Sequence, residues 1–314
     1  MKICVLNGDK VNFDGAVDYN ILGSEVTVHG DCLPGDLAAY AEGFDVIVSK
    51  ELPINREDIM SLPSCVRLIA EAGTGYNNID LEACRERGIA VINVPAYSSE
   101  RVAHTAIMMM LMLASSMRKQ LRMLDGGDHR NFSEHLMVPH TELNGKTMGL
   151  IGTGNIGRKT IAAGKALDME VIAYKPGRRT ADVEYVELDE LLERSDYIFL
   201  HCPLKPETYH MIGAEELKKM KKSAFLINTS RGALVDEQAL IEALRSGEIA
   251  GAGLDVQEHE PLAADSPLFS MDNVIVTPHR GWKGLETRQR LVRILADGIR
   301  SFEEGSTLNR VDLK

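Results

Sequence analysis

Short apolar runs alternate with segments of helical period along almost the whole chain. Apolar runs bounded by polar residues and glycine are typical of buried strands. The alternation predicts an α/β fold in which helices cover parallel sheets. The predicted strands fall into two sets, residues 3–6, 46–49, 68–70 and 90–93, and residues 147–151, 170–173, 197–200, 224–228, 250–255 and 274–277.

Between the two sets, residues 98–123 predict one long helix. Apolar residues dominate its middle, while Arg118, Lys119 and Arg122 suit the negative end of a helix. A helix that is apolar on nearly every face needs burial on every face, whereas a surface helix shows one apolar stripe. We therefore expect a buried connecting helix or, more specifically, the contact surface of a homodimer. Residues 125–141 predict an irregular excursion.

Length and charge narrow the class of protein. A chain of 314 residues exceeds what one hydrophobic core usually supports, so two domains are expected. The formal charge of -11 argues against nucleic acid or an anionic membrane as the main partner. The five cysteines are scattered and form no CxxC pair, which favours reduced thiols in a cytoplasmic protein and no metal site.

The turn Gly152-Thr153-Gly154-Asn155-Ile156-Gly157 carries the first chemical signal. It follows the predicted strand 147–151 and opens a helical segment over residues 156–167, the context that a dinucleotide-binding fingerprint requires. The first glycine permits the tight turn, the second lets the backbone approach the pyrophosphate, and the third lets helix pack on strand. The phosphates would then lie at the positive helix end.

The end of the following strand indicates which coenzyme is bound. An acid that binds the ribose 2′-hydroxyl is expected about 20 residues after the glycine turn. Here the strand is followed by Lys175, Pro176, Gly177, Arg178 and Arg179. Cations suit a 2′-phosphate, so we expect NADP(H) to be preferred and NAD(H) to be possible. The alternative is a solvated basic turn with no influence on coenzyme choice.

Several motifs together resemble the D-isomer-specific 2-hydroxyacid dehydrogenases, in that family's order and spacing over nearly the whole chain. Besides the glycine turn they are Gly73-Thr74-Gly75-Tyr76-Asn77-Asn78-Ile79-Asp80, Asn93-Val94-Pro95-Ala96-Tyr97, Val102-Ala103-His104-Thr105, His201-Cys202-Pro203-Leu204, Asn228-Thr229-Ser230-Arg231-Gly232, Leu254-Asp255-Val256-Gln257-Glu258-His259-Glu260-Pro261 and Thr277-Pro278-His279-Arg280-Gly281-Trp282. The resemblance implies a Rossmann cofactor domain, residues 98–283, inserted into a flavodoxin-like substrate domain, residues 1–97 and 284–314. Both domains would be doubly wound parallel sheets.

The resemblance also implies catalytic roles that suit the chemistry of each side chain. Arg231 would bind the substrate carboxylate and 2-oxygen through its planar fork. His279 would protonate the carbonyl oxygen during reduction and take the proton back in the reverse direction. Glu260 would hold that imidazole. By charge and position alone His201 and Glu258 compete for these roles, and the family pattern of an acid directly before proline selects Glu260.

Further binding residues are implied in the same way. Gly73, Thr74 and Gly75 would offer backbone N–H groups to the substrate carboxylate, as such loops do in the family. The remaining implied contacts concern the coenzyme: Thr153, Asn155 and Ile156 at the pyrophosphate, Pro203 and Thr208 on the adenosine side, and Thr229 and Asp255 at the nicotinamide end.

Within the family, Asn93-Val94-Pro95-Ala96-Tyr97 and Pro278-His279-Arg280-Gly281-Trp282 look most like glyoxylate and hydroxypyruvate reductases. The expected reaction is hydride transfer between NADP(H) and a small 2-keto or 2-hydroxy acid. One alternative is D-lactate or another D-2-hydroxyacid dehydrogenase that uses NAD(H). Another is a nucleotide-sensing binding protein, similar to the corepressors that share this fold, because a fold does not fix a function.

Overall fold

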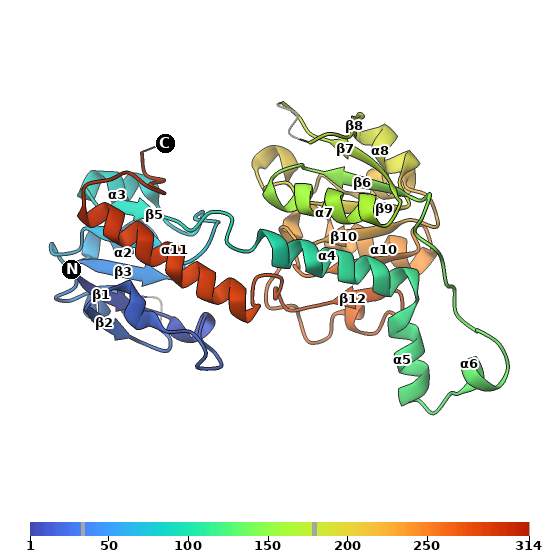
Figure 1. Cartoon of the computed structure of the whole chain (residues 1–314), viewed down its shortest axis with the longest axis horizontal. Helices are drawn as coiled ribbons and strands as arrows, with labels where there is room; N and C mark the ends of the chain where they lie inside the picture. The colour runs from blue at the N-terminus through green and yellow to red at the C-terminus, as the bar shows by residue number, and fades with distance from the viewer. Residues whose placement is uncertain (33–34, 178–180, 314) are drawn as a thin grey trace. The chain divides into compact units, whose positions relative to one another are not determined.

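The structure is a computed structural model that describes residues 1–32, 35–177 and 181–313. The chain divides into two compact units, and each is treated by itself below. Unit 1 comprises Met1–Ser98 and Trp282–Lys314, and unit 2 is the continuous segment Ser99–Gly281. Figure 1 shows one parallel sheet in each unit, with helices on its faces.

Unit 1 contains five parallel strands in the order β2-β1-β3-β4-β5. Their bounds are β1 Lys2–Val5, β2 Glu25–Val28, β3 Val46–Ser49, β4 Leu68–Glu71 and β5 Ala90–Ile92. The chain runs from β1 to β2 on one side and then to β3 on the other. This order is flavodoxin-like, and it places a topological switch point between β1 and β3.

The alternation of side chains along these strands builds a core on each face of the sheet. Val46, Val48 and Leu68 point to the face covered by α11 (Leu285–Glu303). Ile47 and Ile69 point to the opposite face, which is covered by shorter helices. These helices are α1 Leu37–Tyr40, α2 Arg56–Ser61 and α3 Leu81–Arg87.

Unit 2 contains seven parallel strands in the order β12-β11-β10-β9-β6-β7-β8. Their bounds are β6 Thr147–Ile151, β7 Glu170–Tyr174, β8 Glu184–Tyr185, β9 Tyr197–Leu200, β10 Phe225–Asn228, β11 Gly251–Leu254 and β12 Val274–Val276. The strand order is that of a Rossmann dinucleotide-binding fold, extended by β12 at one edge, with its switch point between β6 and β9. The predicted fold class is therefore confirmed.

Helices cover both faces of this second sheet. One core packs under α4 (Ser99–Ala114) and α7 (Asn155–Ala166). The other packs under α8 Leu188–Arg194, α9 Ala214–Lys219 and α10 Glu237–Ser246. Within the described ranges, no helix has both the length and the apolar character needed to cross a bilayer.

The prediction of one helix over residues 98–123 is wrong. α4 ends at Ala114, and a second helix, α5 (Met117–Asp125), follows it. Ser116 adopts a left-handed conformation with φ of 47°, and its hydroxyl donates to the Pro139 carbonyl over 2.7 Å. The hydroxyl of Ser115 donates to the Leu111 carbonyl over 2.8 Å. Serine side chains that bond the backbone compete with regular helix, and here they accompany its interruption.

Of the basic residues of this segment, Arg122 lies in the last turn of α5, as expected for the negative end of a helix, whereas Arg118 lies in the first turn. Arg118 donates to the carbonyl oxygens of Phe269 and Val274, and Arg122 donates to that of Ser270 over 2.7 Å. These carbonyls lie in and around β12 and the turn before it. Both arginines therefore tie α5 to the edge of the second sheet.

Candidate active site

The glycine turn lies at the carboxyl end of β6, at the switch point of the second sheet. Gly152 has φ of 101°, and a Cβ built on it would lie 2.6 Å from the His201 carbonyl oxygen. A Cβ on Gly157 would lie 2.3 Å from the Gly152 oxygen. Both positions therefore require glycine for packing. Gly154 is exposed with nothing within 4 Å of its Cβ direction, so the turn is open to solvent at its centre.

This opening suits a pyrophosphate group, because α7 begins at Asn155 and its first turn carries no acidic residue. The free backbone N–H groups of a helix start bind anions. Two side chains of the turn make contacts within the unit. The Thr153 hydroxyl lies 3.0 Å from the Tyr185 hydroxyl, and Asn155 Oδ1 accepts from Arg158 over 2.6 Å. The backbone of the turn is the main candidate ligand.

Two buried polar atoms near this edge lack a hydrogen-bond partner among the described residues. They are Nδ1 of His201, which follows β9, and Oγ1 of Thr229, which follows β10. His201 Nε2 bonds the Thr160 hydroxyl over 2.9 Å, and burial lowers the pKa of His201 to about 4. Buried polar groups are normally paired, so unpaired ones at a sheet's carboxyl edge are candidates to meet a bound molecule. The residues fit a dinucleotide.

The other predicted coenzyme residues are distributed as follows. Lys175 directly follows β7 and is half-buried, while Arg178 lies outside the described residues. Pro203 and Thr208 belong to one turn, in which the Thr208 hydroxyl donates to the Pro203 carbonyl over 2.8 Å. This turn follows β9, so it belongs to the same edge of the sheet as the glycine turn.

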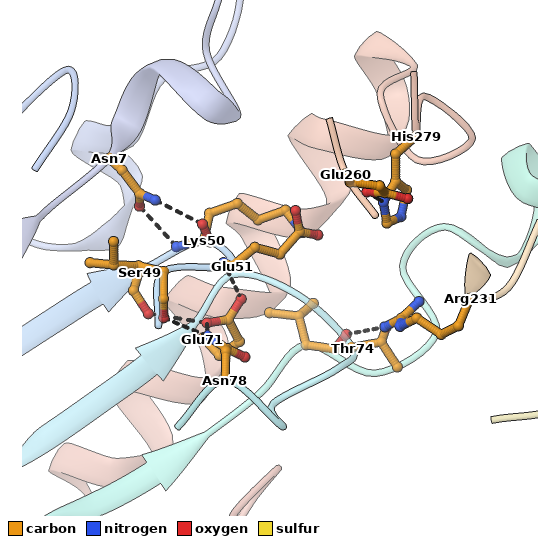
Figure 2. Close-up of polar contacts among 12 residues, drawn as sticks. Asn7, Ser49, Lys50, Glu51, Glu71, Thr74, Asn78, Arg231, Glu260 and His279 are labelled. Atoms are coloured by element: carbon orange, nitrogen blue, oxygen red, sulfur yellow. Dashed lines mark hydrogen bonds and ion pairs between the residues drawn. The ribbon is translucent and has the colours of Figure 1, made fainter. Parts of the chain in front are cut away.

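His279 and Glu260 form a pair. Nδ1 of His279 lies 2.9 Å from Oε2 of Glu260, and the two side chains are 27% and 36% exposed. The imidazole is therefore accessible to a small molecule while one of its nitrogens is held. Figure 2 shows the ring facing the carboxylate, with Arg231 drawn nearby in the same unit.

The loop that carries His279 is fixed by Asp255. His279 has φ of 46°, a conformation that is uncommon for residues other than glycine, and its N–H donates to the Asp255 carbonyl over 2.8 Å. The Asp255 carboxylate accepts from the Thr277 hydroxyl at 2.5 Å and from the N–H groups of Arg280 at 2.9 Å and Gly281 at 2.7 Å. Asp255 thus holds the backbone on both sides of His279.

Arg231 is exposed on a turn at the end of β10. Asn228 Nδ2 donates to the Arg231 carbonyl over 2.8 Å, and Arg231 Nη1 donates to the Ser230 carbonyl over 2.8 Å. The next residue, Gly232, packs so closely that a Cβ on it would lie 1.9 Å from the Gln257 carbonyl carbon. The N–H of Gln257 donates to Glu260 Oε1 over 3.2 Å. The Arg231 turn therefore rests on the segment that orients Glu260.

Glu258 has a partner of its own. Its carboxylate lies 2.7 Å from Nε2 of His210 and accepts from the N–H of Glu237 over 3.2 Å. The sequence left Glu258 and His201 open as alternatives to Glu260 and His279. In the structure His279 pairs with Glu260, Glu258 pairs with His210, and His201 lies beneath the glycine turn. The His210–Glu258 pair was not anticipated.

In unit 1, the loop Gly73-Thr74-Gly75 follows β4 and is tied to the residues after β5. The Thr74 hydroxyl donates to the Val94 carbonyl over 3.0 Å, and Asn93 Nδ2 donates to the Thr74 carbonyl over 2.8 Å. The N–H of Val94 donates to the Gly73 carbonyl over 2.9 Å. These bonds fix the loop's shape.

A buried ionic cluster beside this loop was missed in the sequence. Glu71, at the end of β4, accepts from the N–H of Glu51 at 2.9 Å, the Ser49 hydroxyl at 3.1 Å and Asn78 Nδ2 at 3.1 Å (Figure 2). Burial raises the pKa of Glu71, an effect that these donors and Lys50 oppose. Lys50 directly follows an apolar strand, and that position was the available signal.

Comparisons with known proteins agree with this geometry. Residues 107–281 match the model of the D-isomer specific 2-hydroxyacid dehydrogenase NAD binding domain. The chain is 36% identical to a hydroxypyruvate reductase of Blautia hydrogenotrophica, over 99% of this chain and 100% of that protein. It is 39% identical to a glyoxylate reductase of Korarchaeum cryptofilum, over 81% of this chain and 77% of that protein.

A solved structure extends the similarity to the fold. The apo-structure of D-lactate dehydrogenase from Escherichia coli has a TM-score of 0.86 and 32% sequence identity, and covers 99% of this chain and 100% of that one. The matches to hydroxypyruvate and glyoxylate reductases support the branch that the sequence motifs indicated. The chain belongs to the D-isomer-specific 2-hydroxyacid dehydrogenases, a family of oxidoreductases that use a nicotinamide coenzyme.

Proposed function

We propose that this protein reduces a small 2-keto acid, glyoxylate or hydroxypyruvate, with NADPH, and that His279 is the acid/base group. The observation that carries the proposal is the His279–Glu260 pair, in which a half-exposed imidazole is held 2.9 Å from a carboxylate. NADPH, when bound, supplies the hydride that C2 of the substrate receives. Relatives named hydroxypyruvate reductase and glyoxylate reductase support the choice of substrate.

Each catalytic side chain has a defined task in this proposal. Nε2 of His279 delivers a proton to the carbonyl oxygen as C2 accepts the hydride, so that a 2-hydroxy acid is formed. Glu260 holds Nδ1 of His279 and stabilises the imidazolium form before the proton is transferred. Arg231 binds the substrate carboxylate and the 2-oxygen with its guanidinium, which offers two parallel N–H donors.

The binding residues divide between the units. In unit 2 the turn from Gly152 to Gly157 holds the pyrophosphate, and the Pro203 and Thr208 turn lies on the adenosine side. Thr229, whose hydroxyl has no hydrogen-bond partner among the described residues, serves the nicotinamide end in this proposal. One lone pair of Asp255 Oδ2 serves the carboxamide, besides the bond from Gly281. In unit 1, Gly73, Thr74 and Gly75 bind the substrate carboxylate. Unit 1 is thus the substrate domain and unit 2 the coenzyme domain.

Preference for NADPH rests on the residues after β7. Lys175 occupies the position where an acid would bind the ribose 2′-hydroxyl, and its ammonium suits a 2′-phosphate instead. Arg178, outside the described residues, would add a second cation in the same turn.

We further propose that the protein is a homodimer formed through α4, α5 and the residues that follow. In unit 2 the outer side of α4 lines a pocket of about 320 Å³ that includes Ile107, Met108 and Leu111. Leu124 of α5 is 41% exposed and Phe132 is 79% exposed. Large exposed apolar surface marks contact sites. Sedimentation of the wild type and of Phe132→Asp tests the pairing, and a monomeric wild type would contradict it.

Turnover tests the main proposal. NADPH oxidation is followed with glyoxylate, hydroxypyruvate, pyruvate and phenylpyruvate, and then with NADH in place of NADPH. We expect the highest kcat/KM with glyoxylate or hydroxypyruvate. The highest value with pyruvate would indicate a D-lactate dehydrogenase, and no turnover with any keto acid would indicate a nucleotide-sensing protein.

A further inference from the structure

Unit 1 contains a lysine that the proposed reaction does not use. Lys50 follows β3 at the carboxyl edge of the sheet, and its side chain is only 4% exposed. Asn7, which follows β1, bonds the backbone of Lys50 twice: Oδ1 accepts from its N–H at 2.9 Å and Nδ2 donates to its carbonyl at 2.7 Å. Lys50 therefore lies at the switch point between β1 and β3, where open α/β sheets bind ligands.

The ammonium of Lys50 is buried and has few polar partners. It is paired with the Glu51 carboxylate and lies 4.3 Å from the centre of the Trp282 ring, in the same unit. Among the residues that the structure describes, Glu51 is the one hydrogen-bond acceptor for its three N–H donors. A buried ammonium usually has more of its donors satisfied. Two of the three N–H donors of Lys50 Nζ therefore have no acceptor among the described residues.

The ammonium is also in contact with the loop Gly73-Thr74-Gly75. A Cβ built on Gly73 would lie 3.2 Å from Lys50 Nζ and 3.1 Å from Glu71 Oε1. Any larger residue at position 73 would push against both charged groups. The loop thus lies directly beside Lys50 and Glu71, and its backbone N–H groups lie in the field of the Lys50 charge.

Glu51 is held in a costly conformation beside this lysine. Its φ is 54°, in the left-handed region, and its N–H donates to Glu71 Oε1 over 2.9 Å. Non-glycine residues in this region persist where the surroundings enforce them, and they gather at functional sites. The side chain itself is 46% exposed, so its negative charge is open to solvent while that of Glu71 is buried.

We propose that Lys50 is a positioning and charge-supplying residue for carboxylate binding at the Gly73-Thr74-Gly75 loop, and that Glu51 opposes it. The positive charge under the loop strengthens its attraction for an anion, and the exposed carboxylate of Glu51 weakens it. Together the two residues set the affinity of unit 1 for small carboxylates. The inference rests on the proposed function, because that function places the substrate carboxylate at this loop.

A purely structural ion pair is the competing explanation, and the sign of the effects separates the two. A structural pair is weakened whichever partner is removed, so both substitutions would impair binding. An electrostatic role predicts opposite effects: Lys50→Met weakens binding of the anion, and Glu51→Gln strengthens it. Lys50→Arg, which retains the charge, should restore most of the affinity.

The test measures binding of oxamate, a carboxylate analogue of 2-keto acids that is not reduced, by calorimetry on enzyme saturated with coenzyme. We expect Lys50→Met to raise the Kd about tenfold or more and Glu51→Gln to lower it about threefold. Lys50→Arg should remain within about threefold of the wild type. The exposed pair Lys2–Glu25, 3.7 Å apart in the same unit, provides matched controls in Lys2→Met and Glu25→Gln.

Results that overturn the proposal are a Kd unchanged in Lys50→Met, a Kd raised in both Lys50→Met and Glu51→Gln, or no binding of oxamate to the wild type. If Lys50→Met does not fold, Glu51→Gln carries the test alone, because the Glu51 side chain is 46% exposed. Oxamate binding with the predicted signs but no turnover of any keto acid would refute the proposed function and leave this inference standing.

Discussion

The carboxyl edges of the two sheets are built differently. In unit 1 the charged groups Lys50 and Glu71 are buried, and both lie next to Gly73. In unit 2 Arg231 is exposed and His279 is half-exposed, and the residues that fix them are the uncharged Asn228 and the carboxylates Glu260 and Asp255. Charges that only shape a field can be enclosed, whereas a group that transfers a proton must remain reachable.

The largest expected effect is on proton transfer in unit 2. His279→Gln removes the proposed acid/base group, so we expect kcat to fall about 10³-fold, which corresponds to about 4 kcal/mol, with coenzyme binding retained. Steady-state kinetics and coenzyme fluorescence titration measure the two quantities. His259→Gln, at the exposed residue beside Glu260, should have little effect. A variant at position 279 with near-normal kcat would refute the assigned role.

The next effect concerns the support under Arg231. Gly232→Ala places a methyl group 1.9 Å from the Gln257 carbonyl carbon, so the backbone must move. We expect the free energy of unfolding to fall by about 3 to 4 kcal/mol and kcat/KM to drop with it. Gly213→Ala is the control, because its Cβ would lie no closer than 3.4 Å to a neighbour. Equal denaturation midpoints for the two variants would show that the turn is free to adjust.

A third prediction uses pH to test the buried histidine of unit 2, His201. Burial lowers the pKa of His201 from 6.5 to about 4, so below pH 6.5 the unfolded chain takes up a proton that the folded chain does not. The stability due to this group is complete above pH 6.5 and is lost as the pH falls towards 4.

The loss amounts to about 3 kcal/mol in the free energy of unfolding. In His201→Gln the free energy of unfolding should not fall by this amount as the pH is lowered. In His135→Gln, at an exposed residue, it should fall as in the wild type. Urea denaturation at a series of pH values measures the difference. The prediction fails if the wild type and His201→Gln lose stability in parallel.

The smallest effect is expected on coenzyme choice. Lys175→Asp replaces the cation after β7 with the acid that binds a ribose 2′-hydroxyl. The ratio of kcat/KM with NADPH to that with NADH should shift about tenfold towards NADH. Lys222→Asp, the same substitution at an exposed residue of unit 2, should leave the ratio unchanged. An unaltered ratio in Lys175→Asp would mean that the turn is merely solvated.

Most strands of the two sheets were predictable because their residues are buried and apolar over several consecutive positions. β2 was not predicted because three of its four residues are exposed, and β8 is only two residues long. The pairing of His279 with Glu260 required the family pattern, because periodicity gives no distances. The break at Ser116 depends on Pro139, 23 residues away, and could not be found from local sequence.

The buried cluster of unit 1 shows another limit of the sequence. Lys50, Glu51 and Glu71 are ordinary charged residues in composition. The place of Lys50 directly after an apolar run is a local signal, but it does not show which residues enclose Lys50 and Glu71. Their burial results from the pairing of β3 with β4, in which Ser49 is the register partner of Glu71. The register between β3 and β4 brings these residues together, and a single sequence does not reveal that register.

Because unit 2 is one uninterrupted segment, it can be inherited as a single block. Ser99–Gly281 contains the glycine turn, Lys175, Arg231, Glu260 and His279, whereas the Lys50 cluster and the Gly73 loop belong to the flanking sequence. Within unit 1, Arg290 Nη1 donates to the Tyr97 carbonyl over 2.7 Å, so the two ends that flank the insertion are tied to each other. Recombination at these two junctions would exchange the proposed coenzyme-binding residues and the proposed proton donor in one event. The loop proposed to bind the substrate carboxylate would stay with unit 1.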